Sequence, residues 1–273
     1  MPQPVIFEDL GTRFYREVWD YQENLLQHNL RVKSSASSLA HNKNVQLAEI
    51  GQPDALVEAD DNASLSGNAA GLTRKPGQPL VETVHHLLLV EHPPVYTLGK
   101  SGKEEHILIS NEERDSRGIE YYRINRGGDI TFHGPGQIVG YPILDLEKFY
   151  TDIGRYLREL EEVIILTLAD YGIKGQRSAG ETGVWIEPDI KGRERKICAM
   201  GVRCSRWITM HGFAFNVNTD LSYFDHIVPC GISDKQVTSL QKEIGHPLQI
   251  EEVKEKLKIN FEKVFNVQLI RNP

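Results

Sequence analysis

A cysteine in a proline–glycine turn is the first residue of this sequence that could do covalent chemistry. Cys230 stands between Pro229 and Gly231, whereas Cys198 and Cys204 lack such flanking residues. The thiolate is the nucleophilic form, so a reactive cysteine needs a neighbouring cation that lowers its pKa. A cysteine taken alone is more often a small buried side chain than a nucleophile. Catalysis by Cys230 therefore depends on an activating partner.

Four side chains could supply that positive charge, namely Lys196, His133, His211 and His226. Lys196 opens an otherwise apolar segment, where its ordinary role would be to extend its amine to water from the end of a strand. His226 is only four residues from Cys230, but closeness in sequence is weak evidence for a catalytic base. The residues alone leave the choice open.

A second unusual segment runs from Arg126 to Gln137 and contains four glycines in twelve residues. Glycine fits where the backbone needs a positive φ or where another group approaches it closely. A tight turn without a ligand is the commoner explanation of such a cluster. The segment is neither a Gly-x-Gly-x-x-Gly turn that opens a helix nor a Walker loop, so it does not predict a dinucleotide or P-loop phosphate site.

Apolar periodicity predicts the elements that must position these residues. Apolar residues three or four apart predict helices at 9–32, 151–171, 237–244 and 251–265. Short apolar runs predict buried strands at 87–90, 95–98, 119–124, 138–144, 182–187, 196–204 and 213–217. The helix near residue 152 has Asp152 as a plausible N-cap and Gly172 as its stop. Because strands do not alternate strictly with helices, we expect an α+β fold with a mixed sheet and flanking helices.

Residues 33–80 differ from the rest of the chain in composition. They contain no Phe, Tyr or Trp and are rich in Ser, Gly, Asn and Ala. Such a composition buries little apolar surface and is typical of loops. We therefore expect a flexible insertion at 33–80 within a single domain that spans residues 1–273.

Charge and composition limit the classes of function. The chain has 31 Lys and Arg against 38 Asp and Glu, a net charge of −7, which argues against broad nucleic-acid binding. It has no apolar run near the roughly 18 residues of a membrane helix. The first residues lack the basic and apolar regions of a secretory signal, so we expect a cytoplasmic location. Three cysteines without a Cys-x-x-Cys pair predict neither a disulfide framework nor a zinc site.

Five segments together resemble the octanoyltransferases of lipoate biosynthesis. They are residues 91–99 (EHPPVYTLG), 126–137 (RGGDITFHGPGQ), the strand that Lys196 opens, 211–216 (HGFAFN) and 229–232 (PCGI). They occur in order, with family-like spacing between Lys196 and Cys230. With the N-terminal helix, the resemblance covers most of residues 81–245. Residues 33–80 look inserted relative to compact members.

The resemblance implies a fold shared with lipoate and biotin protein ligases, and a Cys/Lys dyad. Cys230 would take the octanoyl group from acyl carrier protein as a thioester and pass it to a lysine amine, the first step of endogenous protein lipoylation. Lys196 would lower the pKa of Cys230 and relay the proton of the amine. The implied acceptors are lipoyl domains of 2-oxoacid dehydrogenases and the glycine-cleavage H protein. No metal or organic cofactor is implied.

The matched motifs also imply which residues line the acyl site, where small side chains leave room for an alkyl chain and exposed amides could hold the thioester oxyanion. Arg126 has the alternative of a strand-end ion pair, and His133 that of a hydrogen-bonded structural histidine. Cys198 and Cys204 are expected to be structural. The implied acyl-site residues are Arg126, Gly127, Gly128, Asp129, Ile130, Thr131, Phe132, His133, Ala199, Met200, Gly201, Gly212, Phe213 and Ala214.

Residues 191–206 carry six basic side chains and one acid, Glu194. Such a run is usually a solvated face. We expect its exposed members to dock the acidic carrier and lipoyl domains, which would make association depend on salt. The basic members are Lys191, Arg193, Arg195, Lys196, Arg203 and Arg206.

Three other functions compete with this interpretation. An ATP-dependent lipoate-protein ligase of the same fold activates a free acid and needs no nucleophilic cysteine, so the Pro229–Gly231 turn argues against it. An amidotransferase that moves octanoyl between lipoyl-type proteins also uses a cysteine, and only the closeness of the motifs disfavours it. A non-enzymatic module that binds acyl carrier protein would keep the groove and the basic face but would not need Cys230.

Overall fold

The computed structural model describes residues 2–49, 82–228 and 236–271. The chain divides into two compact units, one formed by residues 1–27 and 84–273 and the other by residues 28–83. Helix α1 (Tyr15–Glu49) begins in the first unit and ends in the second. All of the site described below lies in the first unit.

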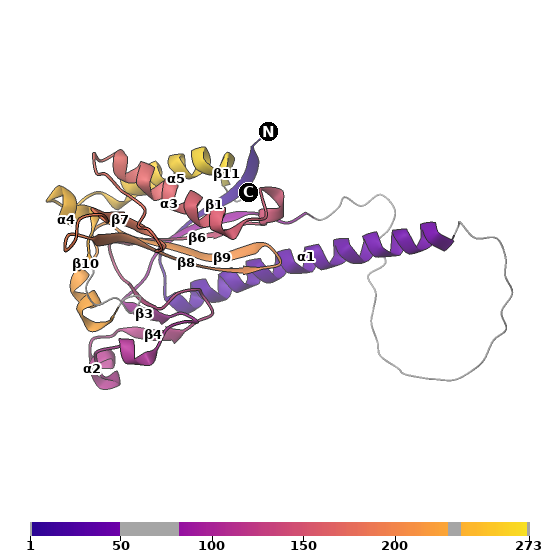
Figure 1. Cartoon of the computed structure of the whole chain (residues 1–273). Coiled ribbons are helices and arrows are strands. Elements are labelled where there is room, and N and C mark those ends of the chain that lie inside the picture. Colours follow the sequence, from indigo (N-terminus) through magenta and orange to yellow (C-terminus); the bar gives the residue numbers. More distant parts are fainter. Residues whose placement is uncertain (1, 50–81, 229–235, 272–273) are drawn as a thin grey trace. The chain divides into compact units, whose positions relative to one another are not determined.

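An eight-stranded mixed sheet forms the centre of the first unit (Figure 1). Its strands run in the order β10-β8-β9-β6-β2-β1-β11, and β7 pairs with β8. Strand β1 is parallel to both β2 and β11, whereas β2, β6, β9 and β8 are successively antiparallel. The strands are β1 (Gln3–Thr12), β2 (His86–Glu91), β6 (Gln137–Ile143), β7 (Val184–Ile186), β8 (Arg195–Ser205), β9 (Ile208–Asn216), β10 (Gln236–Val237) and β11 (Val267–Arg271).

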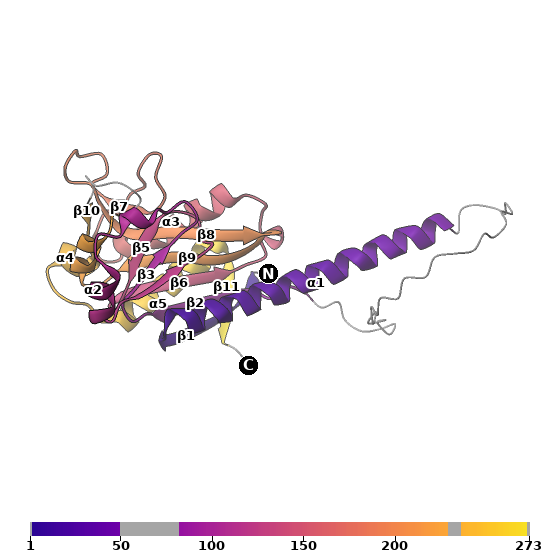
Figure 2. The ribbon, with the colours of Figure 1, turned by 90° about the horizontal axis from the view of Figure 1, so that it is seen from below.

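A smaller sheet of three strands lies on one face of the large sheet, and two long helices lie on the other (Figures 1 and 2). The small sheet has the order β4-β3-β5. Its strands are β3 (Val95–Leu98), β4 (Glu120–Arg123) and β5 (Ile130–His133). Strand β5 lies within the glycine-rich segment. This arrangement places that segment over the centre of the large sheet.

Helices α3 (Ile153–Ala169) and α5 (Ile250–Phe265) pack against each other and cover the apolar core. The predicted cap is present, because the Asp152 side chain accepts a hydrogen bond from the Arg155 N–H at 2.9 Å. Gly172 follows α3 with a φ of +73°, a conformation that favours glycine. The shorter helices are α2 (Asn111–Ser116) and α4 (Leu240–Ile244), with 3₁₀ turns at Glu104–His106, Leu146–Lys148 and Leu221–His226.

The structure confirms an α+β fold with a mixed sheet and corrects the ends of several elements. The helix predicted at 9–32 starts only at Tyr15, because residues 9–12 belong to β1. The helix predicted at 237–244 starts at Leu240, since Val237 is in β10 and Ser239 caps the helix. Strand β9 begins at Ile208, before the predicted Phe213.

The predicted insertion at 33–80 is described only in part. Its first residues are helical, because α1 continues to Glu49, and an uninterrupted helix differs from the loop we expected there. Residues 50–81 lie outside the described residues. A flexible insertion within one domain therefore stays a prediction. Among the described helices, none combines the length and the apolar character needed to cross a bilayer.

Candidate active site

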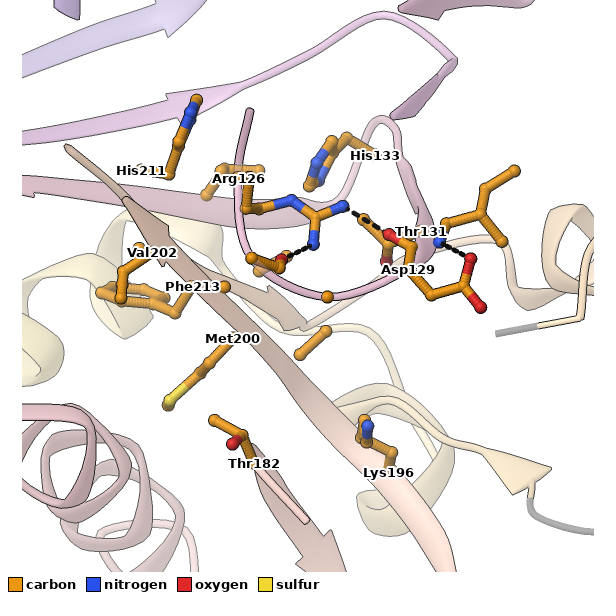
Figure 3. A pocket seen from close by; sticks show the side chains of 18 of the residues that line it. Arg126, Asp129, Thr131, His133, Thr182, Lys196, Met200, Val202, His211 and Phe213 are labelled. Carbon is orange, nitrogen blue, oxygen red and sulfur yellow. Dashed lines mark hydrogen bonds between the residues drawn. The ribbon is translucent and has the colours of Figure 1, made fainter. Parts of the chain in front are cut away.

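A cavity of about 510 Å³ follows strands β8 and β9 beneath the glycine-rich segment (Figure 3). The lining residues on β8 are Lys196 and residues 199–202, and those on β9 are residues 211–214 and Asn216. Ile153 and Leu157 of α3 contribute apolar walls. Lys196 and all the predicted acyl-site residues except Phe132 line this cavity. Segments far apart in the sequence thus meet at one site, as the motif interpretation requires.

The middle of the cavity is bordered by small residues on paired strands. Ala199 lies opposite Ala214, and Gly201 lies opposite Gly212. A Cβ atom on Gly201 would stand 2.7 Å from the carbonyl oxygen of Gly127, a distance that real Cβ atoms do not show. Glycine at this position therefore lets the glycine-rich turn approach β8, and the Gly127 N–H donates to the Val202 carbonyl at 3.1 Å.

Arg126 holds the glycine-rich turn through backbone carbonyls. Its guanidinium donates to the carbonyl oxygens of Gly127 at 2.7 Å and Asp129 at 2.8 Å (Figure 3). It also donates to the Thr97 carbonyl oxygen at 3.1 Å. A planar guanidinium suits this task because its donors point in several fixed directions. The contacts differ from the strand-end ion pair considered as an alternative. Arg126 lines the cavity and also fixes the shape of its roof.

The side chain of Phe132 lies on the other side of β5. Its ring stacks on Tyr223 with centroids 4.5 Å apart, in a separate hydrophobic cluster. Alternate side chains of a strand point to opposite faces, so Thr131 and His133 line the cavity and Phe132 does not. The carboxylate of Asp129 is also occupied, because it accepts from the Ile130 N–H at 2.7 Å and contacts His106 Nδ1 at 2.6 Å.

Burial excludes His133 and His211 as cations that could activate Cys230 at neutral pH. It lowers the pKa of His133 from 6.5 to about 3, with a further contribution from His92. It lowers the pKa of His211 to about 3 in the same way, assisted by Arg126. Both rings are therefore neutral near pH 7. His133 also contacts the Gln137 side chain at 2.8 Å, as a hydrogen-bonded structural histidine would. The ring of His226 contacts Arg117 at 3.1 Å.

Lys196 lies at one end of the cavity, half-buried, with its stem against the β7 segment. It pairs with Trp185 across β7 and β8, and its Nζ lies 4.6 Å from the centroid of the indole ring, a cation–π contact. A Cβ atom on Gly183 would lie 3.6 Å from the Cδ and Cε of Lys196. These contacts hold the amine at the edge of the acyl cavity.

Cys230 lies outside the described residues, as do all of residues 229–235. The residues on either side are well placed. The Val228 N–H donates to the His106 carbonyl at 2.8 Å, and the Gln236 N–H donates to the Glu194 carbonyl at 3.2 Å. Val237 then pairs with Lys196. Strand β10, which holds the first described residues after Cys230, therefore runs beside Lys196.

The other two cysteines differ in their surroundings. Cys198 is fully buried in the core, where loss of solvation raises its pKa well above the ordinary value. Cys204 is exposed near the end of β8. Burial makes Cys198 an inert thiol, as expected for a structural residue.

Three of the basic residues in the run at 191–206, Arg193, Arg195 and Arg203, pair with carboxylates of the protein. Arg195 donates to both carboxylate oxygens of Glu243 at 2.7 Å. Arg193 pairs with Glu187 at 2.9 Å, and Arg203 pairs with Glu23 at 2.7 Å. Docking by the exposed members of the run stays a prediction, and Arg195 and Arg203 are partly buried and paired within the fold.

Sequence reasoning missed several residues of the cavity wall. Gln137 and Asn216 stand at the ends of the quoted motifs and could have been included. The helical residues Tyr15, Ile153 and Leu157 carried no signal, because periodicity shows that a helix packs but not on what. Within residues 2–49, 82–228 and 236–271, the side chains form no group of three or more His, Cys, Asp or Glu that could hold a metal ion.

Solved structures place the fold in a known class. The chain resembles a bi-partite lipoate protein ligase from Thermoplasma acidophilum, with a TM-score of 0.56 and 18% identity over 69% of this chain and 74% of that one. A lipoate-protein ligase A bound with ATP gives a TM-score of 0.56 and 16% identity over 69% of this chain and 76% of that one. The fold is that of the lipoate protein ligases.

Sequence comparisons identify the family to which the chain belongs within this class of fold. The lipoyl protein ligase A/B catalytic domain matches residues 73–262. The octanoyltransferase of Christiangramia forsetii is 48% identical over 98% of this chain and 99% of its own length. That of Flavobacterium psychrophilum is 47% identical over 99% of this chain and 100% of its own length. The chain belongs to the octanoyltransferase family of lipoate biosynthesis, which confirms the resemblance seen in the motifs.

Proposed function

We propose that this acyltransferase moves an octanoyl group from acyl carrier protein to a lysine of a lipoyl domain through a thioester on Cys230. The observation that carries the proposal is the cavity itself. It has apolar walls and small residues in its middle, and Lys196 lies at one end. An octanoyl chain fits along such a cavity with its carbonyl at the lysine end.

The first step is thioester exchange. The Cys230 thiolate attacks the octanoyl carbonyl, the new C–S bond forms, and the bond to the carrier thiol breaks. The electron pair leaves on the carrier sulfur, which takes a proton from the Lys196 ammonium and leaves Lys196 as a neutral amine. The Lys196 ammonium favours the thiolate form of Cys230 because opposite charges attract. Backbone N–H groups near the glycine-rich turn are suited to stabilise the oxyanion.

The second step forms the amide. The acceptor lysine enters as a neutral amine and attacks the Cys230 thioester, so a C–N bond forms and the C–S bond breaks. The Cys230 thiolate is regenerated and the nitrogen loses one proton, which Lys196 accepts or relays. Lipoyl domains of 2-oxoacid dehydrogenases and the glycine-cleavage H protein are the proposed acceptors. The reaction is proposed to take place in the cytoplasm.

Intact mass spectrometry tests the acyl-enzyme directly. The protein is mixed with octanoyl-acyl carrier protein without ATP, as wild type and as Cys230→Ser. We expect an octanoyl adduct that hydroxylamine removes on the wild type alone, and retained adducts on Cys198→Ser and Cys204→Ser. An adduct lost in Cys198→Ser or Cys204→Ser would move the nucleophile to that residue.

A different outcome would change the class of reaction. If neither wild type nor Cys230→Ser forms an adduct, and transfer needs ATP with free octanoic or lipoic acid, the protein is a ligase and the dyad is wrong. If octanoyl-lipoyl domain, rather than octanoyl-acyl carrier protein, forms the adduct, the protein is an amidotransferase. Mass spectrometry alone therefore distinguishes an octanoyltransferase, a ligase and an amidotransferase.

A further inference from the structure

At the end of the cavity that His211 lines, several buried polar atoms have no hydrogen-bond partner among the described residues. Both ring nitrogens of His211 and the Nε2 of Gln22 lie buried without a hydrogen-bond partner. Gln22 is 0% exposed and His211 is 1% exposed. The two residues are adjacent, because the His211 N–H donates to the Gln22 Oε1 at 3.0 Å. Such groups are rare in folded proteins and costly, so this end of the cavity calls for an explanation.

A proline in the neighbouring strand explains why His211 sits there. Gly140 pairs with Phe213, and the Thr209 N–H donates to the Leu144 carbonyl at 2.9 Å, so Pro142 lies opposite His211. Proline has no N–H to offer the ladder. At this break His211 adopts a φ of +62°, and its own N–H turns to Gln22. The neutral imidazole then offers one donor and one acceptor.

The polar end lies farther from Lys196 than an octanoyl chain reaches. Val202 pairs with His211, and six residue steps along β8 from Lys196 correspond to roughly 20 Å. From a C–C bond of about 1.5 Å, an extended octanoyl chain measures roughly 9 Å and a tetradecanoyl chain roughly 16 Å. Lys196 and His211 are at opposite ends of the view in Figure 3. An octanoyl chain therefore ends over the small residues, whereas a tetradecanoyl chain approaches the polar end.

We infer that His211, which lines this end of the cavity, and Gln22, which contacts His211 from α1, limit the length of the acyl chain by keeping that end polar. A long apolar chain that enters this end leaves three buried polar atoms without water or any other partner. A chain that ends in a hydroxyl can donate to and accept from the same atoms. The substrate class is thus apolar chains that end before the polar end, octanoyl among them, together with longer chains that carry a terminal hydroxyl. This inference rests on the proposed function.

The first test uses the unaltered enzyme and two thioesters of acyl carrier protein, tetradecanoyl and 14-hydroxytetradecanoyl. Transfer to a lipoyl domain is measured by mass, with octanoyl as the reference substrate. We expect kcat/KM for the hydroxylated chain to exceed that for the apolar chain at least tenfold. Equal values would overturn the inference, because the polar end would then not distinguish the two chain ends.

The second test removes the polar group from α1. In Gln22→Leu we expect the ratio of tetradecanoyl to octanoyl kcat/KM to rise at least tenfold. Asn24→Leu is the matched control, since Asn24 is exposed on the same helix, and its ratio should not change. An unchanged ratio in a folded Gln22→Leu overturns the inference. If Gln22→Leu does not fold, the two thioesters on wild type decide.

The two proposals fail in different ways. Wild-type enzyme that transfers octanoyl but shows no effect of chain-end polarity refutes only the role of His211 and Gln22. Wild-type enzyme that transfers no acyl group from acyl carrier protein refutes the proposed function, and with it this inference.

Discussion

Four of the buried histidines, those with a lowered pKa, should make this protein lose stability steeply as the pH falls below 7. Burial lowers the pKa of His85 and of His92 to about 4, and of His133 and His211 to about 3. In the unfolded chain each imidazole titrates near 6.5. Between the folded-state and unfolded-state pKa values, the unfolded chain binds more protons than the folded protein. The free energy of unfolding therefore rises with pH in this range.

The size of the effect follows from the number of groups. Between pH 7 and pH 5.5, each histidine that stays neutral in the fold and titrates normally when unfolded costs about 1.3 kcal/mol. Four such groups together cost about 5 kcal/mol, a large share of the 5–15 kcal/mol by which domains are usually stable. The carboxylates titrate mostly at lower pH, so the histidines dominate this window.

Urea unfolding followed by tryptophan fluorescence at pH 7.0, 6.5, 6.0 and 5.5 measures this loss. His85→Gln is the useful variant, because His85 lies outside the cavity and its ring Nδ1 accepts from the Asp145 N–H at 3.2 Å. A glutamine does not titrate, so its stability should fall by about 1.3 kcal/mol less over the same range. A wild-type loss below about 1 kcal/mol would show that the rings are charged in the folded state.

Three further predictions concern the roof of the cavity and its surroundings. Gly201→Ala places a Cβ 2.7 Å from the Gly127 carbonyl oxygen. This overpacking should lower the free energy of unfolding in urea by about 1–3 kcal/mol and raise the KM for the acyl donor. An unchanged KM would mean that the glycine-rich turn moves freely. Arg126→Lys keeps the charge but cannot reach three carbonyls, so about 2 kcal/mol of stability should be lost. Equal urea-unfolding midpoints for wild type and variant would contradict the role of Arg126 in holding the turn. Lys191→Glu with Arg193→Glu should raise the KM for acyl carrier protein at low salt, because both are exposed; a KM independent of salt in wild type and variant would exclude docking there.

The sequence predicted the parts of the fold whose patterns are local. Residues 87–90 form an unbroken apolar run, and a fully buried strand needs one. Strand β1 was missed because only Val5 of its residues is buried, which leaves little alternation to detect. Strand β5 was missed because it lies among glycines, which disfavour strands in general.

The candidate site was predicted to the level of segments but not of side-chain directions. The motifs identified the cavity-lining residues of β8, β9 and the glycine-rich turn. Phe132 was included because the motif was carried over residue by residue without a strand at 130–133, and in β5 its ring turns away from the cavity. The role of Arg126 could not be predicted, since its partners are carbonyls, which every residue has. No sequence pattern indicated a role for Gln22, because that role depends on its contact with His211 where Pro142 interrupts the strand pairing.

The pairing of β1 with β11 has a consequence for how the chain folds as it is synthesised. Gln3 pairs with Val267, so β1 acquires one of its two neighbours only after all the residues between β1 and β11 have been synthesised. Until then β1 exposes an unpaired edge that can join to another chain. Contacts this distant in sequence form slowly. The last few residues of β11 therefore act as a closing strand, and a nascent chain stalled before them is the form most open to aggregation.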